Sequence, residues 1–155
     1  MQPLIDLYYT RMKEKYPSMP ENYIPKPKYT DRTANGLTKV ITEWLAFNKC
    51  QVERVSNQGQ YRDNKKVVTN IIGQQMTIGS GTWTPGQGKK GTADVHSIIK
   101  NRLGYGIPVK WEVKMKDKQS EHQKKYQQEV EQAGGRYFLV HNWDEFYKYY
   151  LEVTT

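Results

Sequence analysis

Hydrophobic residues recur along this chain with several different periods, and each period predicts an element. Residues 35–49 place apolar side chains at the three-and-four spacing of an amphipathic helix. Alternation of apolar and polar residues predicts strands at 50–56 and 109–115. Apolar runs predict further strands at 93–99 and 136–140. The pattern therefore favours a sheet with one helix packed against it early in the chain.

Two more helices follow from capping signals and periodicity. Ser120 is a good N-cap for a helix over 120–133, and a pair of glycines supplies its stop. Residues 143–153 place their aromatic residues on one side of a closing helix. The expected fold class is α/β, with a central mixed four-stranded sheet flanked by helices in the order αβββαβ, followed by the C-terminal helix.

Two segments interrupt this regular pattern. Residues 1–33 combine a short helical pattern with a proline-rich stretch, which predicts a partly extended N-terminal arm before a domain at 34–155. Residues 57–91 are rich in Gly, Asn, Gln and Thr. Their apolar pieces are compatible with an accessory hairpin, whereas the glycines and Pro85 favour a long mobile loop.

Charge points to an acidic partner. The 155 residues have a formal net charge of +8 and a pI of about 9.4, typical of proteins that bind nucleic acid or an anionic surface. Residues 89–125 hold ten basic and four acidic residues, a net charge of +6. A solvated basic surface without a partner is the alternative.

Other classes are excluded or disfavoured by composition. Cys50 is the single cysteine, so an intramolecular disulfide and a cysteine-rich zinc site are both excluded. It is expected to pack in the core, and His96 to be an ordinary strand residue. No apolar run approaches the roughly 20 residues that span a bilayer. We therefore expect no membrane partner and a cytoplasmic location.

The segment 109–115 is the most informative for chemistry. In a strand, Lys110, Glu112, Lys114 and Lys116 point to one side, and the apolar residues between them to the other. An acid and a lysine at this spacing are common in a charged sequence and usually form a surface ion pair.

Asp94 is the reason to favour a functional role for Glu112 over a surface ion pair. It lies at the start of the apolar strand predicted at 93–99, and a turn around residues 104–106 would make the two strands neighbours. Two carboxylates and a main-chain carbonyl suit Mg²⁺ or Mn²⁺, which would neutralise a phosphate and lower the pKa of a bound water. Lys114 is placed to hold or deprotonate that water.

Four segments in order, GTADV, WEVK, SEHQKKY and QAGGRYFLV, resemble the motifs of the virus-type replication-repair nucleases in the PD-(D/E)XK superfamily. The resemblance implies a restriction-endonuclease-like core and metal-dependent cleavage of DNA in phage or bacterial replication, recombination or repair. It implies that Asp94, Glu112 and the carbonyl of Val113 bind the metal, that Lys114 is the catalytic lysine and that Gln123 is a positioning residue. It also implies branched substrates for some members and homodimers for several.

Gln123 has a competing structural interpretation, and the first helix lacks a clear additional ligand. Gln123 stands three residues after Ser120, so it also fits a capping box. Many members of the superfamily supply a further acid near the start of the first helix. Here Asn35 is the nearest candidate, and Glu43 lies away from the centre of that helix's buried face.

Contact with DNA should come mainly from phosphate neutralisation. Trp83 is a candidate for base stacking, or else a hydrophobic anchor for its loop. A catalytically inactive nucleic-acid-binding module and a metal-dependent nucleotide hydrolase are the alternative functions. The candidate basic contacts are Arg54, Arg62, Lys89, Lys90, Lys116 and Lys118.

Overall fold

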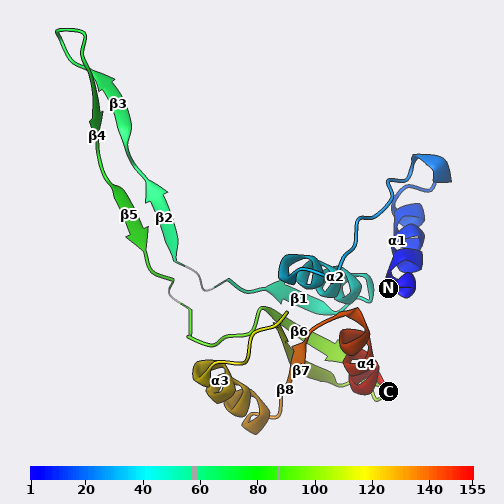
Figure 1. Ribbon diagram of the computed structural model, residues 1–155. Coiled ribbons are helices and arrows are strands. Elements are labelled where there is room, and N and C mark those ends of the chain that lie inside the picture. The colour runs from blue at the N-terminus through cyan, green and yellow to red at the C-terminus, as the bar shows by residue number, and fades with distance from the viewer. Residues whose placement is uncertain (57–58, 87) are drawn as a thin grey trace. The chain divides into compact units, whose positions relative to one another are not determined.

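The structure is a computed structural model that describes residues 1–56, 59–86 and 88–155 (Figure 1). Two compact units divide the chain: unit 1 comprises Met1–Val55 and Gly91–Thr155, and unit 2 comprises Ser56–Lys90. The helices of unit 1 are α1 (Gln2–Lys15), the short 3-10 helix η1 (Glu21–Tyr23), α2 (Ala34–Phe47), α3 (Glu121–Gln132) and α4 (Trp143–Thr154). Its strands are β1 (Gln51–Arg54), β6 (Val95–Lys100), β7 (Gly106–Val113) and β8 (Arg136–Val140).

Unit 1 is built around one mixed sheet with the strand order β1-β6-β7-β8. β1 pairs antiparallel with β6, and β6 with β7, whereas β7 and β8 are parallel and joined through α3. A mixed α/β fold with a four-stranded mixed sheet was predicted, and it is confirmed. The turn around Gly104 does connect β6 to β7, and Val95 pairs with Trp111.

The two faces of the sheet differ in what covers them. α2 and α4 pack against one face and enclose the main core, while α3 lies on the other side (Figure 1). Trp111 is fully buried in this core and contacts the rings of Phe138 and Phe146. The apolar alternation of β7 therefore places its charged residues under α3.

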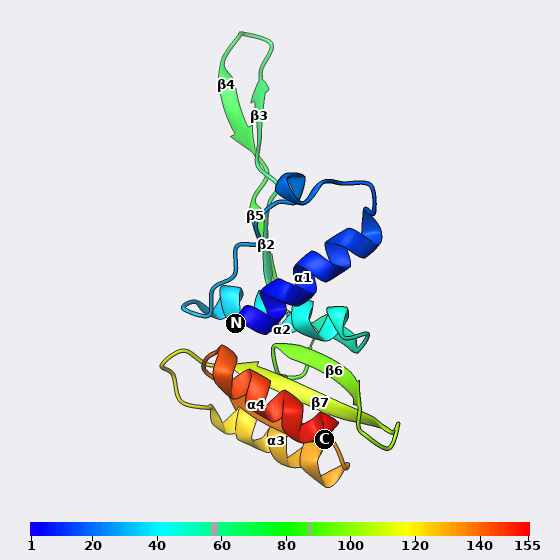
Figure 2. The same ribbon diagram turned by 90° about the vertical axis from the view of Figure 1, so that its right-hand side faces the viewer.

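The N-terminal segment packs against the rest of unit 1. α1 lies against α2 (Figure 2), where Leu4 is fully buried and the Arg11 guanidinium donates to the carbonyl of Phe47 at 2.6 Å. The following residues are mostly irregular, as the prolines predict, but they too are held. Asp31 Oδ2 accepts from the amide of Trp143 at 3.1 Å, which ties this segment to the start of α4.

Unit 2 is a β-ribbon made of two successive two-stranded sheets. β2 (Gln60–Asp63) pairs with β5 (Gly81–Thr84), and β3 (Lys66–Thr69) pairs with β4 (Gln75–Ile78). The apolar pieces thus form the accessory hairpin that was one of the two expectations. β5 occupies part of the glycine-rich stretch that we expected to be loop. Cross-strand packing explains the difference, because the Trp83 ring covers Gly59 and the Tyr61 ring covers Gly81.

Candidate functional site

Asp94 and Glu112 are brought together by the pairing of β6 with β7. Because Val95 pairs with Trp111, the residue before β6 lies beside Glu112 on the face that α3 covers. Asp94 Oδ2 accepts a hydrogen bond from the amide of Val113 at 2.9 Å, which fixes the carboxylate against the end of β7. The Asp94 carbonyl accepts from the amide of Val55 at 2.8 Å.

Glu112 is the buried centre of the site. Its residue is only 3 % exposed, and the Lys114 Nζ lies 3.2 Å from Glu112 Oε1. Gln123 Nε2 donates to the same oxygen, and the Tyr137 hydroxyl lies 3.5 Å from Oε2. Every partner in this network therefore offers a proton or a positive charge to the carboxylate.

Gln123 contacts both the cap of α3 and the Glu112 carboxylate. Its Oε1 accepts from the amide of Ser120 at 2.9 Å, and the Ser120 hydroxyl accepts from the amide of Gln123, which completes a capping box at the start of α3. Its Nε2 remains available for Glu112. The cap thereby fixes the amide that contacts the buried carboxylate.

A glycine allows the chain to approach this helix end. Gly91 has φ +83°, and a Cβ at this position would lie 2.4 Å from the carbonyl oxygen of His122. Only glycine combines that conformation with that contact. The segment that leads into Asp94 is therefore packed against the first turn of α3, which also carries Gln123.

The electrostatics of the site favour a proton or a cation at Glu112. Burial is the largest cause and the facing charge of Asp94 the second, and together they raise the pKa of Glu112 to about 7. Lys114 and Tyr137 act in the opposite direction. Burial, followed by the charge of Glu112, raises the pKa of Tyr137. Tyr137 is thus a neutral hydroxyl that donates to Glu112.

This donor set fits a hard divalent cation. Burial and the facing charge of Asp94 both disfavour the ionised form of Glu112, so its carboxylate carries an uncompensated cost when charged. A cation between the two carboxylates would relieve that cost, and carboxylate oxygens are the ligands that Mg²⁺ and Mn²⁺ prefer. Among the described residues, no group of three or more His, Cys, Asp or Glu side chains is positioned to hold a metal. Any further ligands would have to be main-chain oxygens, water or substrate.

The two candidate ligands on α2 are engaged elsewhere. Asn35 Oδ1 accepts from the Arg54 guanidinium at 2.7 Å. Glu43 accepts from the Tyr29 hydroxyl at 2.6 Å and lies 3.7 Å from Lys39 Nζ. Because α2 packs on the opposite face of the sheet from α3, neither side chain joins Asp94 and Glu112.

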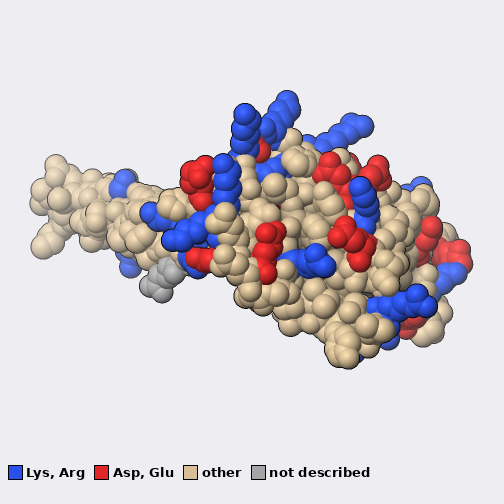
Figure 3. All heavy atoms as spheres, turned by 90° about the horizontal axis from the view of Figure 1, so that it is seen from below, with Lys and Arg blue, Asp and Glu red and all other residues tan. Residues whose placement is uncertain are grey.

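The candidate phosphate contacts lie in both units. Lys116 and Lys118 are exposed in the connection between β7 and α3, immediately after Lys114. Arg62, Lys89 and Lys90 belong to unit 2. Figure 3 shows Lys and Arg interspersed with Asp and Glu over the face it presents, so the net positive charge does not form one uniform surface there.

Sequence patterns alone do not single out Tyr137 or the polar row beside the site. The register aligns Glu53, His96, Lys110 and Tyr137 across the four strands. His96 Nε2 lies 3.3 Å from the hydroxyl of Tyr126 on α3, and burial followed by the charge of Lys110 lowers the His96 pKa. Pairing register would have revealed this row, but a single sequence does not specify it.

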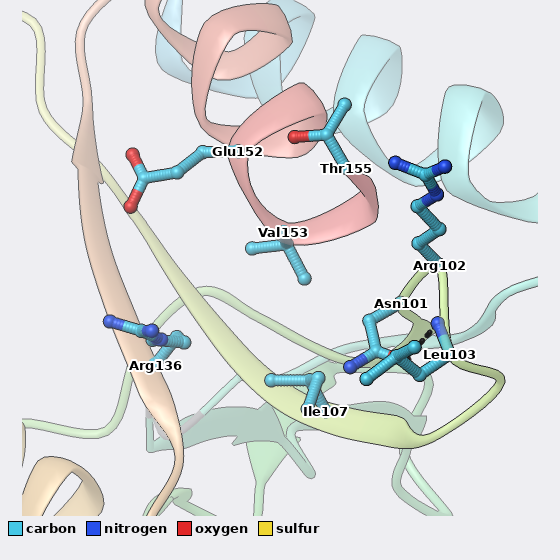
Figure 4. Close-up of a pocket in the computed structure, with 8 residues that line it drawn as sticks. All are labelled: Asn101, Arg102, Leu103, Ile107, Arg136, Glu152, Val153 and Thr155. Carbon is cyan, nitrogen blue, oxygen red and sulfur yellow. Dashed lines mark hydrogen bonds between the residues drawn. The ribbon is translucent and has the colours of Figure 1, made fainter.

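A separate cavity of about 280 Å³ lies near the start of β7, away from Glu112. Ile107 and Val153 line it, and Arg102 and Arg136 lie on opposite sides of it (Figure 4). Glu112 is five residues further along the strand from Ile107, or roughly 17 Å. This cavity is therefore distinct from the carboxylate site.

Comparison of the chain with protein-family models, with curated proteins and with solved structures found no match. In the part of the chain that the structure describes, no helix is long and apolar enough to cross a membrane.

Proposed function

We propose that the protein is a metal-dependent DNA endonuclease with a restriction-endonuclease-like core, using Mg²⁺ or Mn²⁺ to hydrolyse phosphodiester bonds. The observation that carries the proposal is the buried Glu112 carboxylate, which faces Asp94 and is contacted by both Lys114 and Gln123. Structural ion pairs seldom bring two acids together in a buried position, because their mutual repulsion is costly. Sites that bind a divalent cation beside a phosphate commonly use one or two carboxylates in this way.

The contacts of each side chain support a role in this reaction. Asp94 and Glu112 would hold the cation, together with the carbonyl of Val113. The bound cation would supply charge neutralisation at the phosphate and a more acidic water. Lys114 would orient that water and stabilise the negative charge that develops on the phosphate. Gln123 would act as a positioning residue that fixes one oxygen of Glu112.

The net charge of +8 supports a polyanionic substrate. We propose DNA in replication, recombination or repair, with branched or junction DNA as the preferred form. A homodimer would let two such sites cut two strands.

A catalytically inactive DNA-binding module of the same fold is the second candidate. The observation in its favour is that Lys114 and Gln123 both engage Glu112 Oε1, because a purely structural network would satisfy a buried acid with the same contacts.

Cleavage assays with matched variants separate the two candidates. The full chain is incubated with supercoiled, linear, single-stranded and four-way-junction DNA in Mg²⁺, in Mn²⁺ and in EDTA. Glu112→Gln and Lys114→Met are compared with Glu43→Gln and Lys39→Met on α2, which remove the same charges away from the site. We expect losses of at least about 100-fold for the site variants and under about threefold for the α2 variants.

DNA binding in EDTA is measured with the same four variants. If the wild type binds these DNAs but cuts none of them in either metal, the binding module replaces the nuclease. Equal loss of cleavage in all four variants would also refute the assigned roles.

A further inference from the structure

The β-ribbon of unit 2 exposes apolar side chains that nothing in the ribbon covers. All four residues in each of β2, β3 and β4 are exposed, and so are three of the four in β5. An isolated two-stranded ribbon is only marginally stable in water, so a ribbon of this kind gains stability when a partner covers it. The exposed apolar residues of its distal half are Val67, Val68, Ile71, Ile72, Met76 and Ile78.

The turn at the end of the ribbon presents two isoleucines outward. Asn70 Oδ1 accepts from the amides of Ile72 at 3.2 Å and Gln74 at 2.8 Å, and the Asn70 amide donates to the Gln74 carbonyl at 2.9 Å. Gly73 completes the turn with φ +80°. Ile71 is fully exposed and Ile72 is 77 % exposed. The turn is therefore closed by its own polar groups, and its two apolar side chains project from it.

Charge on the ribbon is confined to β2, to the connection between β2 and β3, and to the first residue of β3. Arg62, Lys65 and Lys66 lie there with a single acid, Asp63, and Lys89 and Lys90 follow the last strand. From residue 67 to residue 88 no residue is charged. In Figure 3 the distal part of the ribbon, at the left of the view, correspondingly lacks blue and red side chains. The basic residues of unit 2 therefore lie, along the chain, between unit 1 and the apolar tip of the ribbon.

The net charge of unit 2 favours a polyanion over a second copy of the ribbon as the partner. Unit 2 has five basic residues and one acid, a net charge of +4, so two copies of the ribbon would repel each other when packed together. A polyanion is attracted by the same charges, which can neutralise phosphates on either side of a groove. Two-stranded β-ribbons are also known to bind duplex DNA through the major or the minor groove.

We propose that the ribbon is a DNA-binding arm whose tip, Ile71 and Ile72, inserts between base pairs from the minor groove, while Arg62, Lys65 and Lys66 contact the flanking phosphates. Apolar wedges of this kind unstack a base step and kink the duplex. The side-chain amide of Asn70 is engaged with Gln74 and with the turn, so the tip would read the shape and deformability of DNA rather than its base sequence.

The arm is attached next to the candidate site in the chain. The amide of Val55, just before the ribbon, is bonded to the carbonyl of Asp94, just after it. The inference rests on the proposed function in that both require DNA as the ligand. It adds a deformation of the duplex, which would favour DNA that is already branched, nicked or mismatched because such sites unstack at lower cost.

Base unstacking in EDTA tests the arm without cleavage. The full chain is titrated with a duplex that contains 2-aminopurine at a TA step, and the fluorescence increase on unstacking is recorded with the binding curve. Ile71→Ala/Ile72→Ala is compared with Leu103→Ala, a control in unit 1 that is also 77 % exposed. We expect the double variant to lose the fluorescence increase and to bind about tenfold more weakly, with the control unchanged.

The basic contacts are tested by the salt dependence of binding. Lys65→Ala/Lys66→Ala should lower the slope of log K against log salt by about one for each lysine. Netropsin, which occupies the minor groove, should compete with the wild type. Unstacking and affinity equal to wild type in the double isoleucine variant would overturn the proposal. So would a loss of self-association in that variant with DNA binding intact, since the occupant would then be a second copy.

Cleavage in Mg²⁺, measured on the same proteins, keeps the two proposals separate. If the wild type never cuts but the unstacking signal requires Ile71 and Ile72, the nuclease fails and the arm stands. If the wild type cuts and the double isoleucine variant unstacks DNA as the wild type does, the arm fails and the nuclease stands.

Discussion

Ionisation of Glu112 should make the metal-free protein less stable as the pH rises. Burial and the charge of Asp94 raise its pKa from the ordinary 4.5 to about 7 in the folded chain. The folded state therefore binds this proton more tightly than the unfolded state does. The resulting stabilisation is fully present below about pH 4.5 and is lost as the pH rises through about 7. This difference in pKa corresponds to about 3 kcal/mol of unfolding free energy.

Glu112→Gln isolates that contribution, because the amide has the shape of the protonated acid and does not ionise. Urea unfolding, followed by tryptophan fluorescence in EDTA, is measured between about pH 4.5 and pH 8. We expect the two proteins to be equally stable at the acidic end, and the variant to be more stable by about 3 kcal/mol at the alkaline end. Glu43→Gln is the control and should follow the wild type.

Adding a divalent metal provides a second test within the same experiment. At about pH 8, Mg²⁺ or Mn²⁺ should restore stability to the wild type and leave Glu112→Gln nearly unaffected, because only the wild type offers two charged carboxylates. Parallel pH profiles for wild type and Glu112→Gln would refute the claim that Glu112 is buried against a second acid. An equal response of both proteins to metal would refute its role as a ligand.

Two structural predictions concern stability alone. Gly91→Ala should destabilise the fold by about 1–3 kcal/mol in thermal unfolding, because φ is positive and the added Cβ meets the backbone of α3. Gly104→Ala, which has φ +84° in open space, should cost less, and equal losses would exclude the steric explanation. Ser97→Ala should cost about 1–3 kcal/mol because it leaves the buried Trp111 Nε1 without its acceptor at 2.9 Å. A double-mutant cycle with Trp111→Phe measures this coupling, and additive losses would show that the bond contributes nothing.

The regular elements could be predicted from the sequence because their hydrophobic periods are set by burial on one side. α2 and β8 follow their predicted apolar patterns closely, and both pack against the main core. β7 ends at Val113, two residues earlier than the alternation suggested. Beyond that residue the chain leaves the sheet, so Lys116 lies in an exposed connection rather than on the strand face with Glu112.

The ribbon was harder to predict because its strands are stabilised by contacts that no period in the sequence encodes. The stretch around Trp83 is rich in glycine, which usually favours loops. In the structure the Tyr61 ring covers Gly81, the first residue of β5, and the Trp83 ring covers Gly59, just before β2. Intrinsic preference is overruled here by cross-strand aromatic packing.

The candidate site likewise contains some contacts that local sequence signals predict and others that they do not. The proximity of Asp94 and Glu112 follows from one hairpin between neighbouring strands, which local turn signals predict. Tyr137 reaches Glu112 only through the parallel pairing of β8 with β7, two strands that α3 separates in the sequence. Non-local pairing of that kind has no signature in a single sequence.

Gln123 shows why two interpretations of one residue need not exclude each other. A glutamine amide is planar and rigid, with its acceptor oxygen and its donor nitrogen pointing in different directions within that plane. The oxygen completes the cap of α3 through Ser120, and that bond orients the nitrogen toward Glu112. Glutamate at this position would preserve the cap but direct a second negative charge at the buried carboxylate, which the site cannot accommodate without a cation or a proton. The cap alone would tolerate either residue, so the contact with Glu112 is what requires the amide.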